Sequence, residues 1–288
     1  MQKMTENTNP LQKYYRQPQI YIKLPSNGRW YTPEVFTPTE NGEIPILPMT
    51  AKDELAFKTP DALISGQATV DVIKSCVPNL KDPWQMVNFD TDTILLAIRI
   101  ATYGETMNID YNVPKINEKV STALNLPALL EGLTKVEITD SCKTKQGFTI
   151  TLAPLRYKDL TKIIIAQYEQ QRIYASAVAS SVNEVTRSKT FAESFKKLNE
   201  MNFEMLIQSI SSITTPDGQD VKDKNQIIEF INNAPSDMIE EIQTELAKIR
   251  SQAQTPPLKI KATDDQIKKG APVSFEVPVT FDNSNFFG

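Results

Sequence analysis

The chain has 288 residues, of which 40% are apolar, so it can bury at least one substantial hydrophobic core. Its 31 Lys and Arg against 35 Asp and Glu give a net charge of -4, which leaves no basic excess to neutralise a nucleic-acid backbone. The chain has no histidine, which excludes His-based triads and His-ligated metals, whereas carboxylate, lysine or Ser/Lys chemistry stays open.

The N-terminal residues are polar and show no periodicity. They lack the apolar core of a signal peptide, and no later apolar run reaches the roughly 18 residues of a membrane-spanning helix. We therefore expect a protein that is made and kept in a cytoplasm, with no membrane partner. Residues 1–18 are predicted to form a flexible arm or an extended strap, in which Tyr14 and Tyr15 could dock on a neighbouring protein.

A β element is predicted next. Residues 19–24 alternate apolar and polar side chains and end at a Pro-Ser-Asn-Gly turn, which is typical of a strand. The pair Asn41-Gly42 precedes another apolar alternation, so residues 30–48 are expected to form a hairpin.

Helical spacing follows in the next hundred residues. A short helix is expected from Pro60, and the three-to-four spacing around Cys76 places this cysteine in a core. The run from Asp90 to Gly104 combines an acidic cap, a long apolar stretch and a C-terminal glycine, which predicts a central buried helix. The other cysteine, Cys142, lies in an unlike setting, so no disulfide is inferred.

The middle of the chain is expected to pass from irregular structure to helices. Residues 108–126 show no clear pattern, and residues 136–140 and 148–152 alternate like a second hairpin. Apolar spacing from Leu160 to Val182 and from Phe191 to Ile213 predicts two antiparallel helices. After a turn at 215–218, two further helices are expected, the second one with an acidic first turn at Asp237.

The C-terminal tail alternates strictly and needs a sheet to join. That sheet could be the N-terminal β element or could belong to a neighbouring subunit. Two terminal phenylalanines would be unfavourable unless docked, on the chain itself or on a partner. The candidate partner-binding residues of the tail are Phe275, Val277, Val279, Phe286 and Phe287.

These elements predict an α+β protein: an N-terminal β element plus hairpin with a small helical lobe, a helical C-terminal lobe and an extended β-forming tail. The expected domains are a flexible arm at 1–18, an α+β lobe at 19–153, a helical lobe at 154–251 and the tail with its strand at 252–288.

Motifs for catalysis are weak. The phosphate-binding glycine patterns are missing, and the pairs Glu240-Glu241 and Asp264-Asp265 are better explained as surface or capping charges. Ser26 lacks a base and a nucleophile elbow, so turn formation explains it better, and aromatic Trp30 and Tyr31 are more often packed than ligand-binding. We predict no catalytic residue, no cofactor and no metal.

Five segments of the chain carry a resemblance to a known family: LPSNG at 24–28, PILPMTAKDE at 45–54, ILLAIRIATYG at 94–104, APLRYKD at 153–159 and FDNSNFF at 281–287. They resemble the baseplate hub and hub assembly family of T-even-type contractile-tailed bacteriophages. The resemblance covers nearly the whole chain, in matching order and spacing. Members of this family that carry Cys-Pro-x-Cys after the Tyr-Gly have a natural metal clip, but Val113 and Ile116 stand there instead, so no zinc site is carried over and apolar packing would replace it.

The resemblance implies a non-enzymatic component of the tail baseplate hub, oligomeric in the assembly and located in the virion after assembly in the host cytoplasm. Its partners would be other hub proteins and the tape measure protein. The alternative is a transient assembly chaperone that offers apolar helix faces to the tape measure or to hub proteins. A cell-wall hydrolase is the third hypothesis, which the missing histidine and the weak carboxylate pairs disfavour.

Overall fold

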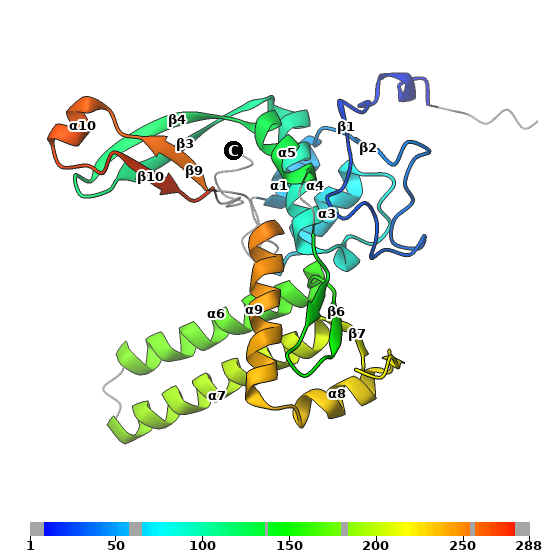
Figure 1. Cartoon of the computed structure of the whole chain (residues 1–288). Coiled ribbons are helices and arrows are strands. Elements are labelled where there is room, and N and C mark those ends of the chain that lie inside the picture. Colours follow the sequence, from blue (N-terminus) through cyan, green and yellow to red (C-terminus); the bar gives the residue numbers. More distant parts are fainter. Residues whose placement is uncertain (1–8, 58–64, 136–137, 180–183, 254–256, 280–288) are drawn as a thin grey trace, which may run out of the picture.

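The computed structural model describes residues 9–57, 65–135, 138–179, 184–253 and 257–279, and it confirms the α+β class expected from the sequence. Helices and small antiparallel sheets surround two separate groups of buried apolar side chains (Figure 1). The first group comes mostly from the N-terminal elements and the second mostly from later ones. The four domain ranges expected from the sequence remain a prediction.

The first core is formed by a two-stranded sheet and four helices. Cys76 is completely buried within it, in the helix that its spacing predicts. The helix expected from Pro60 lies outside the described residues. The elements of this core are β1 (Ile20–Ile22), β2 (Ile44–Ile46), α1 (Ala51–Phe57), α3 (Gln67–Cys76), α4 (Asn88–Tyr103) and α5 (Leu126–Thr134).

Helix α4 is the central helix of the molecule, as predicted. Its apolar side chains are buried on all sides, and Ile94, Leu96 and Ile98 are completely inaccessible to solvent. Gly104 follows its last turn with φ of 94°, and the N–H of this glycine donates to the carbonyl of Ile100. An all-round apolar helix is stable only when other elements cover every face, which the first core does here.

The prediction that Asp90 caps α4 is wrong. The helix begins two residues earlier, and Asp90 is completely buried. Its Oδ1 accepts a hydrogen bond from the backbone N–H of Ser26 at 3.0 Å, and its Oδ2 accepts one from the hydroxyl of Tyr31 at 2.6 Å. Burial raises the pKa of Asp90 to about 6, although the hydrogen bonds from Ser26 and Tyr31 oppose this rise. The carboxylate therefore joins the N-terminal turn to α4.

The predicted hairpin at 30–48 is also wrong in its pairing. Strand β2 pairs antiparallel with β1, from Ile20 opposite Ile46 to Ile22 opposite Ile44. The segment between the strands contributes a single bridge, from Phe36 to Leu80. The asparagine-glycine turn does form, but the strand it leads into finds a partner farther away in the sequence.

Residues 108–126, expected to be irregular, form a regular β-hairpin. Strands β3 (Thr106–Val113) and β4 (Glu118–Asn125) pair over their full length. Lys115 and Asn117 have positive φ in the turn that joins them. Polar residues alternate with modest apolar ones along both strands, so the period of two is present but the apolar signal is weak.

The second core lies around a four-stranded sheet in the order β5-β6-β7-β8. The predicted second hairpin forms, although its first strand starts at Ser141, where a loop was expected. The helix predicted to reach Ile213 ends at Gln208, and Ile213 lies in a strand that pairs with Ile150. The elements are β5 (Ser141–Lys143), β6 (Thr149–Leu152), β7 (Ile210–Thr214), β8 (Asp220–Val221), α8 (Lys224–Asn232) and α9 (Ser236–Ala253).

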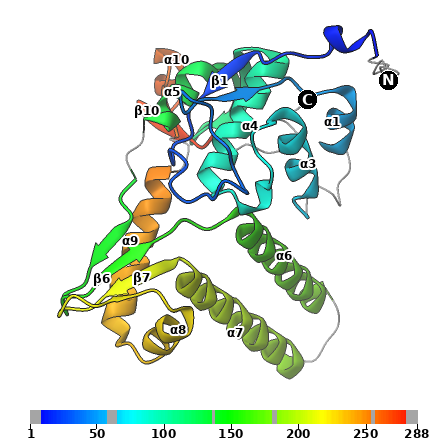
Figure 2. The same ribbon diagram turned by 90° about the vertical axis from the view of Figure 1, so that its right-hand side faces the viewer.

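Two hairpins project from these cores (Figures 1 and 2). Antiparallel helices α6 (Tyr157–Ala179) and α7 (Glu184–Gln208) form one of them, as predicted. The second consists of β3 and β4, on which the C-terminal part of the chain folds back. That part comprises β9 (Leu258–Lys261), α10 (Asp264–Lys268) and β10 (Ser274–Val277).

Gly66, before α3, offers a test of the contact between α3 and the base of α6. A Cβ there would lie 3.1 Å from Thr161 Cγ2 and 3.2 Å from the hydroxyl oxygen of Tyr157, and Gly66 has φ of 73°. We expect Gly66→Ala to lower the free energy of unfolding by about 2–3 kcal/mol, from backbone strain plus the clash. The control Gly218→Ala has similar strain at φ of 90° with nothing within 4 Å, so it should cost about 1 kcal/mol. Equal losses of unfolding free energy for Gly66→Ala and Gly218→Ala, measured by urea unfolding, would contradict the contact between α3 and α6.

Candidate interaction surfaces

The α6–α7 hairpin is the largest described part of the molecule outside both cores. Its helices have 23 and 25 residues, which corresponds to roughly 35 Å of length. Neither core contains a described residue between 164 and 202, and the buried residue of that stretch is a glutamine, Gln170. Helices are stabilised mainly by packing an apolar face, and the described part of this hairpin packs little of its apolar surface against the two cores.

Two neighbouring hollows without charged lining residues lie along the hairpin, and together they are called the groove below. Its inner part, of about 330 Å³, lies between α6, α7 and α9, and is lined by apolar residues such as Leu155 and Leu246. Its outer part, of about 430 Å³, lies between α6 and α7, and Gln167 lines both parts. Lining side chains of both parts are apolar, amide or hydroxyl-bearing. A groove of this composition is typical of a surface that another protein covers.

Exposed apolar side chains flank the groove. Ile164 is 49% exposed and Tyr168 is 52% exposed, one helical turn apart on α6. On α7, Phe191 is 54% and Phe195 is 58% exposed, and their rings stack with centroids 6.3 Å apart. The sequence pattern places these four residues at helical core spacing, and their exposure was therefore missed. The available signal was the polar residues next to them, such as Gln167, Gln170 and Gln171.

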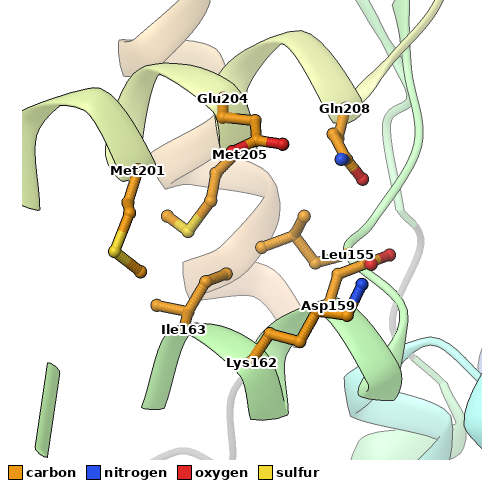
Figure 3. Close-up of a pocket in the computed structure, with 8 residues that line it drawn as sticks. All are labelled: Leu155, Asp159, Lys162, Ile163, Met201, Glu204, Met205 and Gln208. Atoms are coloured by element: carbon orange, nitrogen blue, oxygen red, sulfur yellow. The ribbon is translucent and has the colours of Figure 1, made fainter. Parts of the chain in front are cut away.

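A small hollow with charged residues at its edge lies between α6 and α7 near the base of the hairpin, and it shares Leu155, Ile163 and Met205 with the inner part of the groove (Figure 3). Met201 and Met205 of α7 point toward Ile163 of α6, and Asp159 and Lys162 lie at its edge. This cavity measures about 110 Å³. This hollow is lined in part by charged residues and the groove is not, so the groove is the candidate docking surface.

Residues 9–18, the described part of the predicted arm and here called the N-terminal strap, expose the two predicted tyrosines. Tyr14 is 73% exposed and Tyr15 is 56% exposed, so both are accessible, and their role as a partner interface remains a prediction. The next residue, Arg16, is anchored: its Nη1 donates to the carbonyl of Pro48 at 2.5 Å and to Asp53 Oδ2 at 3.2 Å. Its Nη2 donates to the carbonyl of Ser75 at 2.6 Å. No local sequence pattern indicated this role for Arg16.

The C-terminal strand pairs within the chain. β10 is antiparallel to β9, with Phe275 opposite Ile260, so it joins neither the N-terminal sheet nor, along this edge, a neighbouring subunit. The ring of Phe275 lies 5.8 Å from that of Tyr111 in β3. Val277 is half-buried, and Val279 is buried in the first core, where the chain itself covers it. Phe286 and Phe287 lie outside the described residues.

Residues considered for chemistry have structural roles where the chain is described. Ser26 is completely buried, and its Oγ accepts a hydrogen bond from the N–H of Gly28, which confirms turn formation. Trp30 packs edge-on against Phe89. Glu241 pairs with Lys145 at 2.9 Å, and Asp264 lies in the first turn of α10, whose N-cap is Thr263. Among the described residues no group of three or more Cys, Asp or Glu is placed to hold a metal ion.

The loop where the resemblance would place a metal clip is part of the tip of the β3–β4 hairpin. Val113 is buried there and Ile116 is half-buried. Glu118, at the start of β4, accepts hydrogen bonds from Gln266 and Lys269 at 3.2 Å and 3.0 Å, which holds the C-terminal segment against this tip. No helix in the described part of the chain is long and apolar enough to cross a membrane.

Two cores that carry projecting hairpins, with an uncharged groove and exposed aromatic side chains, define a protein of the binding and assembly class. A model of the family described as T4 bacteriophage base plate protein matches residues 17–268, most of the chain. The chain therefore belongs to the T4 bacteriophage base plate protein family. Searches of curated proteins and of solved structures found no match.

Family membership makes the chain a structural baseplate component of a bacteriophage tail. Its partners are therefore other baseplate proteins, and its location is the tail of the virion. The family favours a structural role over a catalytic one.

Proposed function

We propose that this chain is a permanent structural subunit of the baseplate hub, which acts through protein–protein interfaces and contacts other hub proteins and the tape measure protein. The observation that carries the proposal is the uncharged groove of the α6–α7 hairpin with its exposed aromatic side chains. An exposed apolar surface of this kind marks a site that another protein covers, which supports a role in a lasting assembly. The exposed tyrosines of the N-terminal strap add a second possible contact.

A transient assembly chaperone is the second candidate. The same groove favours it, because a seam between two antiparallel helices can receive the apolar face of a helical client. The in-chain pairing of β10 removes one reason for preferring a permanent role, since that strand already has a partner along one edge. The structural role requires that the chain stays in the finished phage particle, and the chaperone role requires that it leaves during assembly.

Mass spectrometry distinguishes the two roles. The chain is quantified in purified phage particles and in lysates of infected cells, relative to a known tail protein. A fixed, small-integer copy number per tail is the expected result. Abundance in the lysate with absence from particles would reject the structural role and support the chaperone.

We propose that the chain has no enzymatic activity. Turnover on purified cell walls provides the check, with the wild-type protein and the carboxylate variants Glu241→Gln and Asp264→Asn. No turnover is expected. Robust turnover that one carboxylate substitution abolishes would overturn this part of the proposal.

A further inference from the structure

The β3–β4 hairpin is a two-stranded sheet that projects to one side of the molecule (Figure 1). In the described part of the chain, β3 pairs with β4 and with no other strand. The C-terminal segment packs on one face: Phe275 lies beside Tyr111 of β3, and Lys269 donates to Glu118 of β4. These contacts share a face because Tyr111 lies opposite Val120, which is two residues from Glu118. They therefore leave the outer edges of β3 and β4 uncovered.

The register shows which backbone groups point to the open edge of β3. The N–H of Leu126 donates to the carbonyl of Glu105, which makes these two residues a hydrogen-bonded pair. Such pairs alternate along an antiparallel ladder, so every second residue counted from Glu105 bonds to β4. The residues between them direct their backbone N–H and C=O groups away from β4. All four of these residues are exposed: Thr106, Asn108, Asp110 and Asn112.

The edge of β3 lacks the features that usually protect an edge strand. Natural sheets block a free edge with lysine, proline, a bulge or a very short strand. Strand β3 has 8 residues, contains no lysine, arginine or proline, and pairs with β4 without a register shift. The outer edge of β4 differs, because this strand carries the exposed Lys119. A two-stranded sheet also gains stability from a third strand, so β3 is the edge better suited to receive one.

We propose that an extended segment of another baseplate protein pairs with the open edge of β3 as a third strand of this sheet. Its backbone supplies the donors and acceptors that the outward groups of β3 need. Its side chains alternate, with apolar residues beside the half-buried Met107 and Ile109 and polar residues on the other face. Glu105 and Asp110 are exposed acids and β3 has no basic residue, so the incoming strand carries a lysine or arginine. This edge is separate from the α6–α7 groove, so the inference goes beyond the proposed function.

Proline substitution on the two edges of the hairpin tests the proposal. Asn108 of β3 and Ala123 of β4 lie directly opposite each other, and the N–H of each points outward. Proline at either position therefore removes one outward N–H and no hydrogen bond of the hairpin. Each variant is supplied as the only copy of the chain during infection, and infectious particles are counted. Asn108→Pro should lower the particle yield at least about tenfold, whereas Ala123→Pro should leave it near the wild-type value. Equal yields for the two variants would overturn the inference.

Hydrogen–deuterium exchange of the wild-type chain keeps the test valid if a proline variant fails to fold. Exchange is compared between the purified chain and the complex isolated from infected cells through a tag on the chain. The outward amides of β3 should exchange fast in the purified chain and slowly in the complex, whereas those of β4 should exchange fast in both. Unprotected β3 amides in the complex would overturn the inference. Protection in the purified chain that rises with its concentration would also overturn it, because a second copy would then be the occupant. Retention in particles, measured by mass spectrometry, decides the proposed function separately.

Discussion

Replacing Asp90 with alanine should lower the free energy of unfolding by about 3–4 kcal/mol at pH 5, the largest loss that we expect from one polar substitution. Alanine leaves the buried N–H of Ser26 and the hydroxyl of Tyr31 without their acceptor, and each loss costs about 1–3 kcal/mol. Asp90→Asn should lose less, because the amide oxygen can still accept from one of the two donors. Urea unfolding monitored by circular dichroism provides the measurement.

The same carboxyl makes stability depend on pH. Its pKa of about 6 in the folded chain lies above the ordinary 3.8 because of burial, so between these values the folded chain holds more protons than the unfolded one. The contribution is fully present below about pH 3.8 and is lost as the pH rises through about 6, by about 3 kcal/mol. Asp90→Asn should remove this dependence of stability on pH. The buried hydrogen bonds to Asp90 would be contradicted if Asp90→Asn left the pH dependence unchanged, or if the Asp90→Ala chain were as stable as the wild type.

Asp92 provides the matched control for Asp90 on the same helix. Burial alone raises the pKa of Asp92 to about 7. Asp92→Asn should therefore increase stability at pH 8 by on the order of 1–2 kcal/mol, because it removes a charge that burial penalises. At pH 5, Asp90→Asn should lower stability, whereas Asp92→Asn should leave it nearly unchanged, because Asp92 carries no charge at that pH and no hydrogen bond from Ser26 or Tyr31 is lost. No loss for Asp90→Asn at pH 5 would show that the hydrogen bonds to Asp90 contribute little.

Replacing Arg16 with alanine should cost about 2–4 kcal/mol. The guanidinium bridges the carbonyls of Pro48 and Ser75 and the carboxylate of Asp53, which joins the N-terminal strap to two helices. Burial would raise the pKa of Asp53, but hydrogen bonds from Thr50 and Ser75 and the charge of Arg16 hold it below its usual value. Arg16→Lys should lose about half as much, because one ammonium cannot reach all the acceptors.

Arg29 provides the comparison for Arg16. It pairs with Asp140 at 3.1 Å, but both side chains are well exposed, so Arg29→Ala should cost less than about 1 kcal/mol. Limited proteolysis gives a second reading: loss of Arg16 should make the strap cleavable, and loss of Arg29 should not. Similar stabilities for the two alanine variants would show that Arg16 does not anchor the strap.

Strong periodic patterns predicted their elements correctly. The central helix α4, the antiparallel helices α6 and α7, and α9 follow from apolar spacing and end signals that lie within each element. The exception at Ile213 is instructive: its spacing continues that of the preceding helix, and only pairing with Ile150 makes it a strand. A strand whose partner lies about sixty residues away is decided by contacts that no local pattern contains.

The candidate docking surface shows the same difference between what local sequence patterns predict and what the tertiary structure decides. Sequence placed Ile164, Tyr168 and Phe195 on helices at core spacing but could not show that the hairpin extends beyond both cores, because exposure depends on which elements surround it. Tyr14 and Tyr15 needed no such information, since a polar, aperiodic arm is expected at the surface.

Composition and local pattern by themselves determined the α+β class, the main helices and the resemblance to a phage baseplate family, because these depend on residue type and short-range spacing. The tertiary structure alone decided that Asp90 is a buried acceptor rather than a cap, that Arg16 anchors the strap, and that β10 pairs with β9. Each of these contacts joins residues that are separated in the sequence, and β10 could have paired with more than one strand. The free energy of such contacts depends on burial and geometry, which exist only once the chain has folded.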